Sequence, residues 1–175
     1  YNYLFRECLT MPPKALAHIC NFDQREQSLE DHLIAVSQLT SKFADKIRLP
    51  KSGNIIGLLH DFGKYSNDFQ IYLKSATGLI NQDEDEYVNA KSLKGRIDHS
   101  TAGAQYIWEI FSQYRSGPCF AQLLSLAICS HHSGLIDCLK LDGTNNFKAR
   151  IEKDNSLTHC SEAKSAMDYA IKHYL

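Results

Sequence analysis

The stretch that decides the fold is Ile55-Ile-Gly-Leu-Leu-His-Asp-Phe-Gly-Lys64. Its first residues are apolar and do not alternate with polar ones as in a half-buried strand, so we expect a central, buried helix. His60 and Asp61 follow this apolar run, and Gly63 offers a C-terminal stop. Because successive helical residues point about 100° apart, the helix would direct both side chains towards one shallow cavity.

Helical periodicity continues on both sides of this stretch. From Ser28 to the closing Pro50, apolar residues recur at three- and four-residue steps, which predicts one amphipathic helix. Those residues are Leu29, Leu33, Val36, Leu39, Phe43 and Ile47. Further helices are predicted after Ser66, which can cap one, from about Ser100, over 120–130 beyond the break at Gly117-Pro118, and from Ser161. Convincing period-two runs are absent, so the predicted fold class is all-α.

The chain of 175 residues suits a single domain spanning 1–175. Residues 77–97 differ from the rest, because they combine Gly78, the acidic run Asp83-Glu-Asp-Glu86 and several basic residues with few apolar anchors. This composition predicts a mobile surface loop or lid in that segment.

Composition narrows the classes of function. The formal net charge is −1 and the sequence pI is about 6.8, so no global positive field recruits a polyanion, and any contact with nucleic acid must be local. No apolar run approaches the roughly 20 residues that span a bilayer, and no membrane partner is expected. Six cysteines are scattered without a C-x-x-C pair, which indicates free thiols in a reducing cytoplasm.

The histidines carry the strongest chemical signal. Five of the eight are predicted at helix positions beside apolar faces: His32, His60, His99, His131 and His132. A carboxylate beside imidazoles offers one anionic oxygen and several nitrogen donors, a mixed site that suits a divalent transition metal and lets the carboxylate bridge a second ion. Two such ions can clamp a phosphodiester and activate water. Taken singly, each histidine also fits an ordinary core position, and His-Asp is a common dipeptide.

Four motifs together resemble a known family. They are EDHLIAVSQL at 30–39, GLLHDFGKYSNDFQ at 57–70, DHSTAGAQ at 98–105 and SHHSGL at 130–135. The set is similar to the HD nuclease domain of the type I CRISPR-associated nuclease-helicase, over about 17–134. The resemblance implies an all-α HD-domain helical bundle with a metal site between its central helices. The HDxGK core alone occurs across the HD superfamily, and the other motifs make the resemblance more specific.

The resemblance also assigns roles to residues. It implies metal ligation by His32, His60, Asp61, His99, His131 and His132. It places Asp61 and Lys64 in the catalytic machinery, and Lys64 and Gln70 at the substrate, where the ammonium would stabilise charge on a scissile phosphate. His18 matches an early histidine of the family and is structural or peripheral. His159 and His173 lie outside every motif and are expected to be solvated.

One expected ligand has no clear match. The resemblance implies a further aspartate, well after the His-His motif, that completes the metal site. The carboxylates of this type after His132 are Asp137, Asp142, Asp154 and Asp168, and none stands in matching surroundings. Asp168 is the nearest imitation, and we expect the matching segment to lie beyond Leu175.

The sequence is compatible with three alternative functions. The resemblance implies a nuclease that uses two divalent ions (manganese, nickel, cobalt or iron, with magnesium as an option) to cleave single-stranded DNA in antiviral defence. Its partners would be a superfamily 2 helicase domain or subunit and a CRISPR guide-RNA surveillance complex. The HDxGK core is also compatible with a phosphohydrolase of nucleotides or cyclic dinucleotides. The unmatched aspartate leaves open an inactive HD module that serves in docking.

Overall fold

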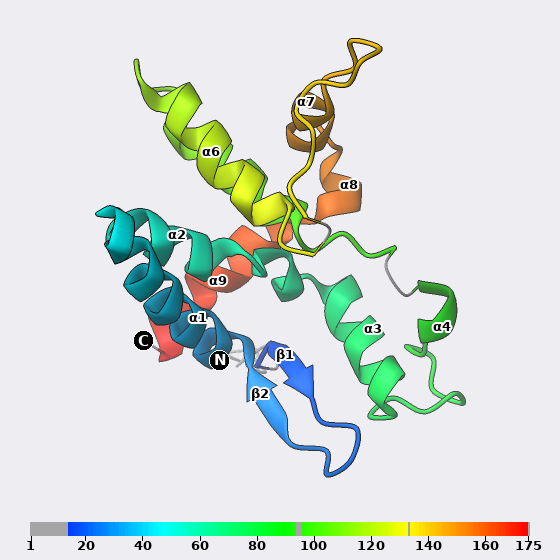
Figure 1. The fold of residues 1–175 in the computed structure, drawn as a ribbon. Helices are drawn as coiled ribbons and strands as arrows, with labels where there is room; N and C mark the ends of the chain where they lie inside the picture. Colours follow the sequence, from blue (N-terminus) through cyan, green and yellow to red (C-terminus); the bar gives the residue numbers. More distant parts are fainter. Residues whose placement is uncertain (1–13, 94–95, 133, 175) are drawn as a thin grey trace, which may run out of the picture.

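The computed structural model describes residues 14–93, 96–132 and 134–174, and it confirms an all-α fold (Figure 1). The helices are α1 Leu29–Ala44, α2 Pro50–Leu59, α3 Asn67–Thr77, α4 Ala90–Leu93, α5 Thr101–Phe111, α6 Gly117–Cys129, α7 Asn146–Ile151, α8 Asn155–Thr158 and α9 Cys160–Tyr174, with 3-10 turns η1 Asp45–Ile47 and η2 Phe62–Tyr65. The sequence did not predict the small antiparallel hairpin of β1 Leu16–Ile19 and β2 Glu26–Ser28. No helix in the described ranges has the length and apolar character to cross a bilayer.

Helices α1 and α2 lie side by side and pack through small residues (Figure 1). A Cβ on Gly57 would lie 2.4 Å from Ser37 Cα, so only glycine allows this approach. One turn away, the Thr40 hydroxyl donates to the carbonyl of Gly53 at 2.7 Å. The close face of α1 is therefore formed by small polar residues rather than by the outer part of the predicted apolar stripe.

The predicted stripe on α1 is buried only in its first half. Leu29 and Leu33 enter the core, whereas Leu39 and Phe43 are 52% and 56% exposed, and Ile47, which lies beyond α1 in η1, is 69% exposed. The physical reason is that the α1 and α2 backbones meet through Ser37, Thr40 and two glycines, which turns the larger side chains outward.

The helix boundaries around the His-Asp pair also differ from the prediction. Pro50 begins α2 at its first turn, where the missing N–H costs nothing, rather than closing the preceding helix. Helix α2 ends at Leu59, His60 caps it, and Asp61 has left the helix with φ −107° and ψ 21°. The two side chains are therefore not 100° apart on one helix. Helix α2 is also less buried than expected, since Leu58 is exposed.

Two glycines bring later segments against the end of α2. The Gly63 N–H donates to the carbonyl of His99 at 3.1 Å, and a Cβ on Gly63 would lie 2.5 Å from His99 Cα. Gly63 is thus a point of close contact rather than a helix stop. Gly103 in α5 is a second point of close contact, because a Cβ added there would lie 2.0 Å from the carbonyl oxygen of Leu59. Both contacts place His99 beside His60 and Asp61.

The core lies between α1, η2, α5, α6 and α9. Phe62 is fully buried and stacks on Tyr106, with ring centroids 5.3 Å apart and planes 13° apart. Ala163 of α9, in the helix predicted from Ser161, is fully buried in the same cluster. The predicted break of α5 at Gly117-Pro118 is wrong, because α5 already ends at Phe111 and this pair begins α6. Phe62, the residue directly after the His-Asp pair, is therefore a fully buried member of the hydrophobic core.

The segment 77–97 begins at Gly78, which ends α3 in the left-handed conformation with φ 79°. Ile80 is buried, and the Val88 N–H donates to the Ser75 hydroxyl at 3.2 Å. These two anchors tie the segment to α3, while its mobility stays a prediction. Among the described cysteines, Cys129 and Cys160 are buried and Cys119 is exposed, all as free thiols; Cys8 lies outside the described residues.

Replacing Gly103 by Ala tests the close approach of α5 to α2. The new methyl group would clash with the Leu59 carbonyl, and because backbone must shift, we expect the free energy of unfolding to fall by about 1–3 kcal/mol. Alanine's better helix propensity, worth about 1 kcal/mol, acts in the opposite direction. Urea unfolding measures the change, with the exposed Lys51→Ala as control. A Gly103→Ala protein as stable as the control would contradict the packing described.

Candidate metal centre

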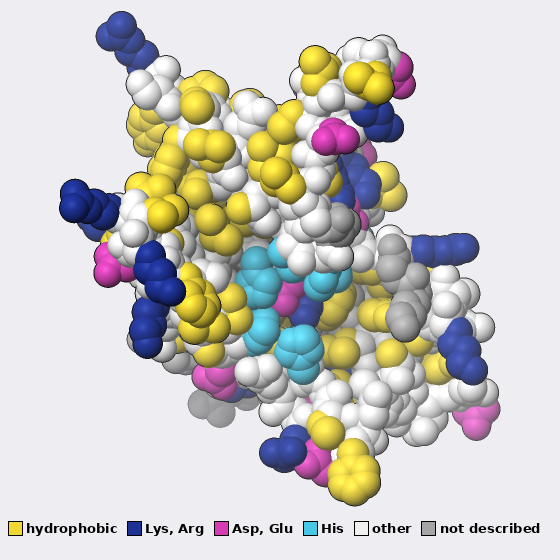
Figure 2. All heavy atoms as spheres, in the orientation of Figure 1, with side chains coloured by type: hydrophobic (Ala, Val, Ile, Leu, Met, Phe, Trp, Pro, Cys, Tyr) yellow, Lys and Arg dark blue, Asp and Glu magenta, His cyan; other side chains and the backbone are white. Residues whose placement is uncertain are grey.

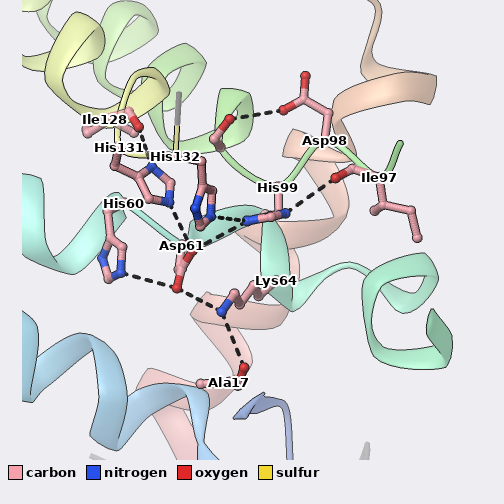
Figure 3. Close-up of polar contacts among 12 residues, drawn as sticks. Ala17, His60, Asp61, Lys64, Ile97, Asp98, His99, Ile128, His131 and His132 are labelled. Atoms are coloured by element: carbon pink, nitrogen blue, oxygen red, sulfur yellow. Dashed lines mark hydrogen bonds and ion pairs between the residues drawn. The ribbon is translucent and has the colours of Figure 1, made fainter. Parts of the chain in front are cut away.

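A cluster of histidine rings surrounds Asp61 and Lys64 on one face of the molecule (Figure 2). Asp61 is 3% exposed, so its carboxylate lies at the bottom of this cluster rather than at the surface. Figure 3 shows His60, His99, His131 and His132 approaching it from different segments of the chain. The cluster is the place where the predicted metal ligands meet.

The two oxygens of Asp61 face two different sets of side chains. Oδ2 lies 3.2 Å from Nε2 of His32, 3.2 Å from Nε2 of His60 and 2.9 Å from the Lys64 ammonium. Oδ1 lies 3.3 Å from Nε2 of His131 and 3.7 Å from Nε2 of His99. One carboxylate therefore stands between two groups of imidazoles.

Main-chain carbonyls set the tautomers of these rings. Nδ1 of His60 lies 2.8 Å from the Gly57 oxygen, and Nδ1 of His131 lies 2.6 Å from the Ile128 oxygen. Because a carbonyl only accepts, each Nδ1 must carry the proton, which leaves the Nε2 of a neutral ring as a lone pair. Both lone pairs point at Asp61. This is the second-sphere arrangement that orients histidine ligands of metals.

An oxygen of Asp61 lacks a hydrogen-bond donor. Oδ1 is buried and no donor bonds it in the part of the chain that the structure describes. Burial would raise the pKa of Asp61, but the positive charge of the Lys64 ammonium, 2.9 Å from Oδ2, acts in the opposite direction, and the pKa lies well below its usual range, so the group is ionised. An anionic oxygen facing nitrogen lone pairs is costly unless a cation lies between them.

The cluster divides into two donor groups that share Asp61. Asp61, His99, His131 and His132 form one, and His18, His32 and Asp61 form the other; in each group the donor atoms lie within 4.8 Å of one another. In the first group, Nε2 of His99 and Nε2 of His132 are 2.7 Å apart. One carboxylate shared by two nitrogen-rich groups fits one or two divalent cations.

Most of these imidazoles are neutral near pH 7. Burial lowers the pKa of His99 to about 4, in spite of the neighbouring Asp61. Burial also lowers the pKa of His32, His132 and His18. His60 is the exception, because its contacts with Asp61 outweigh burial and raise its pKa. Neutral rings keep the lone pair that a metal needs.

The ligand candidates come from one helix face and three chain segments at helix ends. His32 lies on α1, His60 caps the C-terminus of α2, and His131 and His132 follow the end of α6. His99 was predicted at a helix position, but it lies just before α5. Its Nδ1 is 3.3 Å from the Ile97 oxygen. All six predicted ligand side chains nevertheless lie in the one cluster.

Lys64 and Gln70 occupy positions that differ from the predicted substrate contacts. Lys64 is 5% exposed, and its ammonium donates to Asp61 and to the Ala17 carbonyl at 3.3 Å, so it is not directed at solvent (Figure 3). Gln70 is 9% exposed, and its amide bonds the N–H and C=O of Leu16 and the C=O of Lys64. The Gln70 side chain is therefore occupied by backbone.

Asp98, the residue directly before the predicted ligand His99, was not singled out from the sequence. It accepts from the Thr101 N–H and hydroxyl, from the Arg150 guanidinium at 3.2 Å and from the Lys153 ammonium at 2.6 Å. Burial would raise its pKa, but Lys153 and Thr101 outweigh burial and lower it. These bonds fix the chain directly before His99. Its position three residues before Thr101 is a helix-capping signal that the sequence contains. Its partners Arg150 and Lys153 are more than 50 residues away, so no local signal in the sequence indicated them.

The remaining candidates lie outside the cluster. His159 was expected to be solvated, but its ring lies 3.3 Å from Asp68 and 3.6 Å from Glu162 and is mostly buried. Asp168, like the other carboxylates considered after His132, is exposed and belongs to neither donor group. The side chain of His173 lies outside the described residues. Asp61 is therefore the one carboxylate of the donor groups found in the described ranges.

Comparison with known proteins agrees with this geometry. The family model described as "Cas3, HD domain" matches residues 23–173, which is more than half of the chain. A search of curated proteins found no match. The matched range contains the six predicted ligands, but His18 lies before it.

Asp61→Asn tests the cation affinity of the cluster. In the wild-type protein, manganese at about 100 times its dissociation constant should stabilise the fold by about 2.7 kcal/mol and raise Tm by roughly 5–10 °C. The variant keeps the shape of the side chain but loses its charge, so we expect no rise. Differential scanning calorimetry with and without manganese measures this. Asp168→Asn should respond like the wild type, and an undiminished rise in Asp61→Asn would exclude the cluster as the binding site.

Asp98→Asn tests the anchor before His99. The substitution removes the charge that Arg150 and Lys153 share, so we expect the free energy of unfolding at pH 7 to fall by about 1–3 kcal/mol. Because the folded-state pKa of Asp98 is lowered, its contribution is complete above about pH 4 and is lost as pH falls through the folded-state pKa. Denaturation at a series of pH values should therefore show the two proteins converging in acid. A difference that does not depend on pH would contradict the ionic account.

Proposed function

The chain belongs to the family of Cas3 HD domains, and we propose that it is a metal-dependent nuclease that cleaves single-stranded DNA during CRISPR interference. The observation that carries this proposal is the ionised Asp61 between two groups of imidazoles, with one buried oxygen that no donor bonds among the described residues. Such a carboxylate suits a bridge between two cations. Divalent ions held there would supply Lewis acidity towards a phosphodiester and would activate water.

The chain's own residues divide this work. We propose His32, His60, Asp61, His99, His131 and His132 as ligands, with manganese, nickel, cobalt or iron preferred because nitrogen donors dominate the cluster. The Gly57 and Ile128 carbonyls hold the proton on Nδ1 of two of these rings. In its neutral form each of these rings therefore directs the lone pair of Nε2 towards the position of a cation.

Lys64 and Gln70 act in this proposal as positioning residues. The Lys64 ammonium donates to Asp61, which orients the carboxylate and offsets its charge. Gln70 holds β1 against η2 through the backbone of Leu16 and Lys64. Direct contact of either side chain with the substrate stays a prediction.

The proposed substrate is a strand delivered by a partner. The net charge of −1 gives no global attraction for DNA, so much of the grip on the strand would come from elsewhere. In line with the family, we propose that a superfamily 2 helicase, fused or separate, supplies single-stranded DNA after a guide-RNA surveillance complex has opened the target duplex in the cytoplasm.

Cleavage of circular single-stranded DNA tests this function. With manganese or nickel present, the wild-type protein should linearise and degrade the circle, and chelation should abolish cleavage. Asp61→Ala should lose at least about 100-fold in rate, because the shared ligand is removed. Asp168→Ala is the matched control, since this carboxylate is exposed and outside the cluster. Activity unchanged by Asp61→Ala would refute the proposed centre.

A panel of nucleotides and cyclic dinucleotides distinguishes the competing chemistry. The nuclease should leave these compounds intact while it cleaves DNA. Release of phosphate or of a linear dinucleotide, without cleavage of DNA, would instead assign the same cluster to a nucleotide phosphohydrolase.

A further inference from the structure

His18 lies beside the predicted ligands although it belongs to a different part of the fold. It is carried by β1, and its ring meets that of His32 edge to face, with centroids 4.9 Å apart and planes 79° apart. Donor atoms of His18, His32 and Asp61 lie within 4.8 Å of one another. The His32 side of the Asp61 carboxylate therefore has a third donor that the predicted ligand set did not include.

An irregularity in the hairpin directs His18 to this position. Leu16 pairs with Ser28 and His18 pairs with Gln27, so β1 contains one extra residue, Ala17, between them. In a regular strand Leu16 and His18 would share a face, but here Leu16 and Ala17 are both buried and His18 is not. Bulges of this kind re-aim side chains and occur next to active sites.

The segment after the His-Asp pair holds the hairpin against the cluster. Lys64 bonds both Asp61 and the carbonyl of Ala17, the residue directly before His18. Gln70 bonds both the N–H and the C=O of Leu16. Three bonds therefore join the bulged part of β1 to Lys64 and Gln70, and these bonds fix the position of His18.

We propose that His18 is a metal ligand, which closes a second cation position with His32 and Asp61 opposite the group of His99, His131 and His132. This proposal rests on the metal-dependent function proposed above. Nε2 of His60 lies 3.3 Å from Nε2 of His32 and adjoins the same position. The second position thus has several imidazoles and the one carboxylate that it shares with the first.

The donor set predicts which ions this position prefers. Imidazole nitrogen binds nickel, cobalt, manganese and zinc well, whereas magnesium prefers carboxylate and water oxygens. Because His18 supplies a neutral nitrogen, the position should strongly favour transition ions over magnesium. His18 is also the exposed member of its group, so this ligand lies at the solvent side of the cluster.

Cobalt binding to the whole chain tests the assignment without depending on catalysis. The protein is freed of metal with a chelator, titrated with cobalt(II) by calorimetry and by visible absorption, and analysed for metal content after desalting. The wild-type protein should bind two ions. His18→Ala should keep one ion near wild-type affinity and bind the other at least about 10-fold more weakly, with a weaker absorption per ion.

Three further measurements make the result specific. His18→Asp should restore the second ion and raise the affinity for magnesium, because an anionic oxygen replaces the nitrogen. His159→Ala, which removes a ring held by Asp68 and Glu162, should bind like the wild type. The metal-free melting temperature of His18→Ala should match that of the wild type, which separates ligand loss from unfolding of the hairpin.

The outcomes separate this inference from the proposed function. A His18→Ala protein that binds two ions with wild-type affinity would overturn the inference alone. Equal weakening of both ions, or a wild-type protein that binds a single ion, would also overturn it. A wild-type protein that binds no divalent ion would instead remove the proposed metal-dependent function.

Discussion

The buried negative charge of Asp61 is the constraint around which the molecule is arranged. A carboxylate out of water needs donors or cations, and this one has a lysine on one oxygen and imidazoles around both. Two of the histidines come to it from helix C-termini, where the last carbonyls lack partners within the helix. His60 and His131 each bond the carbonyl three residues earlier, at the ends of α2 and α6. The same bond completes the helix end and orients the ring.

Bringing these helix ends together requires backbones to approach closely. Gly63 allows η2 to rest on His99, and Gly103 allows α5 to cross the Leu59 carbonyl directly before His60. Phe62, between Asp61 and Gly63, anchors the same short segment in the core. The geometry of the metal centre is thus set by hydrophobic packing on one side of a four-residue turn and by backbone contact on the other.

Local sequence signals were sufficient for most of the helices and for the meeting of the histidines. Ser66 does cap α3, and the six predicted ligands lie in one cluster. Features that depend on distant contacts could not be predicted. Leu39 and Phe43 follow a helical stripe, yet the small residues of α2 draw the other side of α1 inward. Asp98 meets Arg150 and Lys153 from more than 50 residues away. The hairpin has too few residues to show a period of two, so His18 had no structural context in the sequence.

Lys64 couples the position of the hairpin to the orientation of the Asp61 carboxylate. Its ammonium is buried and has two acceptors, one on Asp61 and one on the backbone of Ala17. If the hairpin left its place, the ammonium would lose one of the two acceptors that compensate for its burial, at a cost of about 1–3 kcal/mol. Ordering of the hairpin and orientation of the carboxylate are therefore coupled equilibria. A ligand or force that displaces the strand would therefore change the stability of the oriented carboxylate. By reciprocity, the orientation of the carboxylate changes the stability of the docked strand by the same coupling free energy.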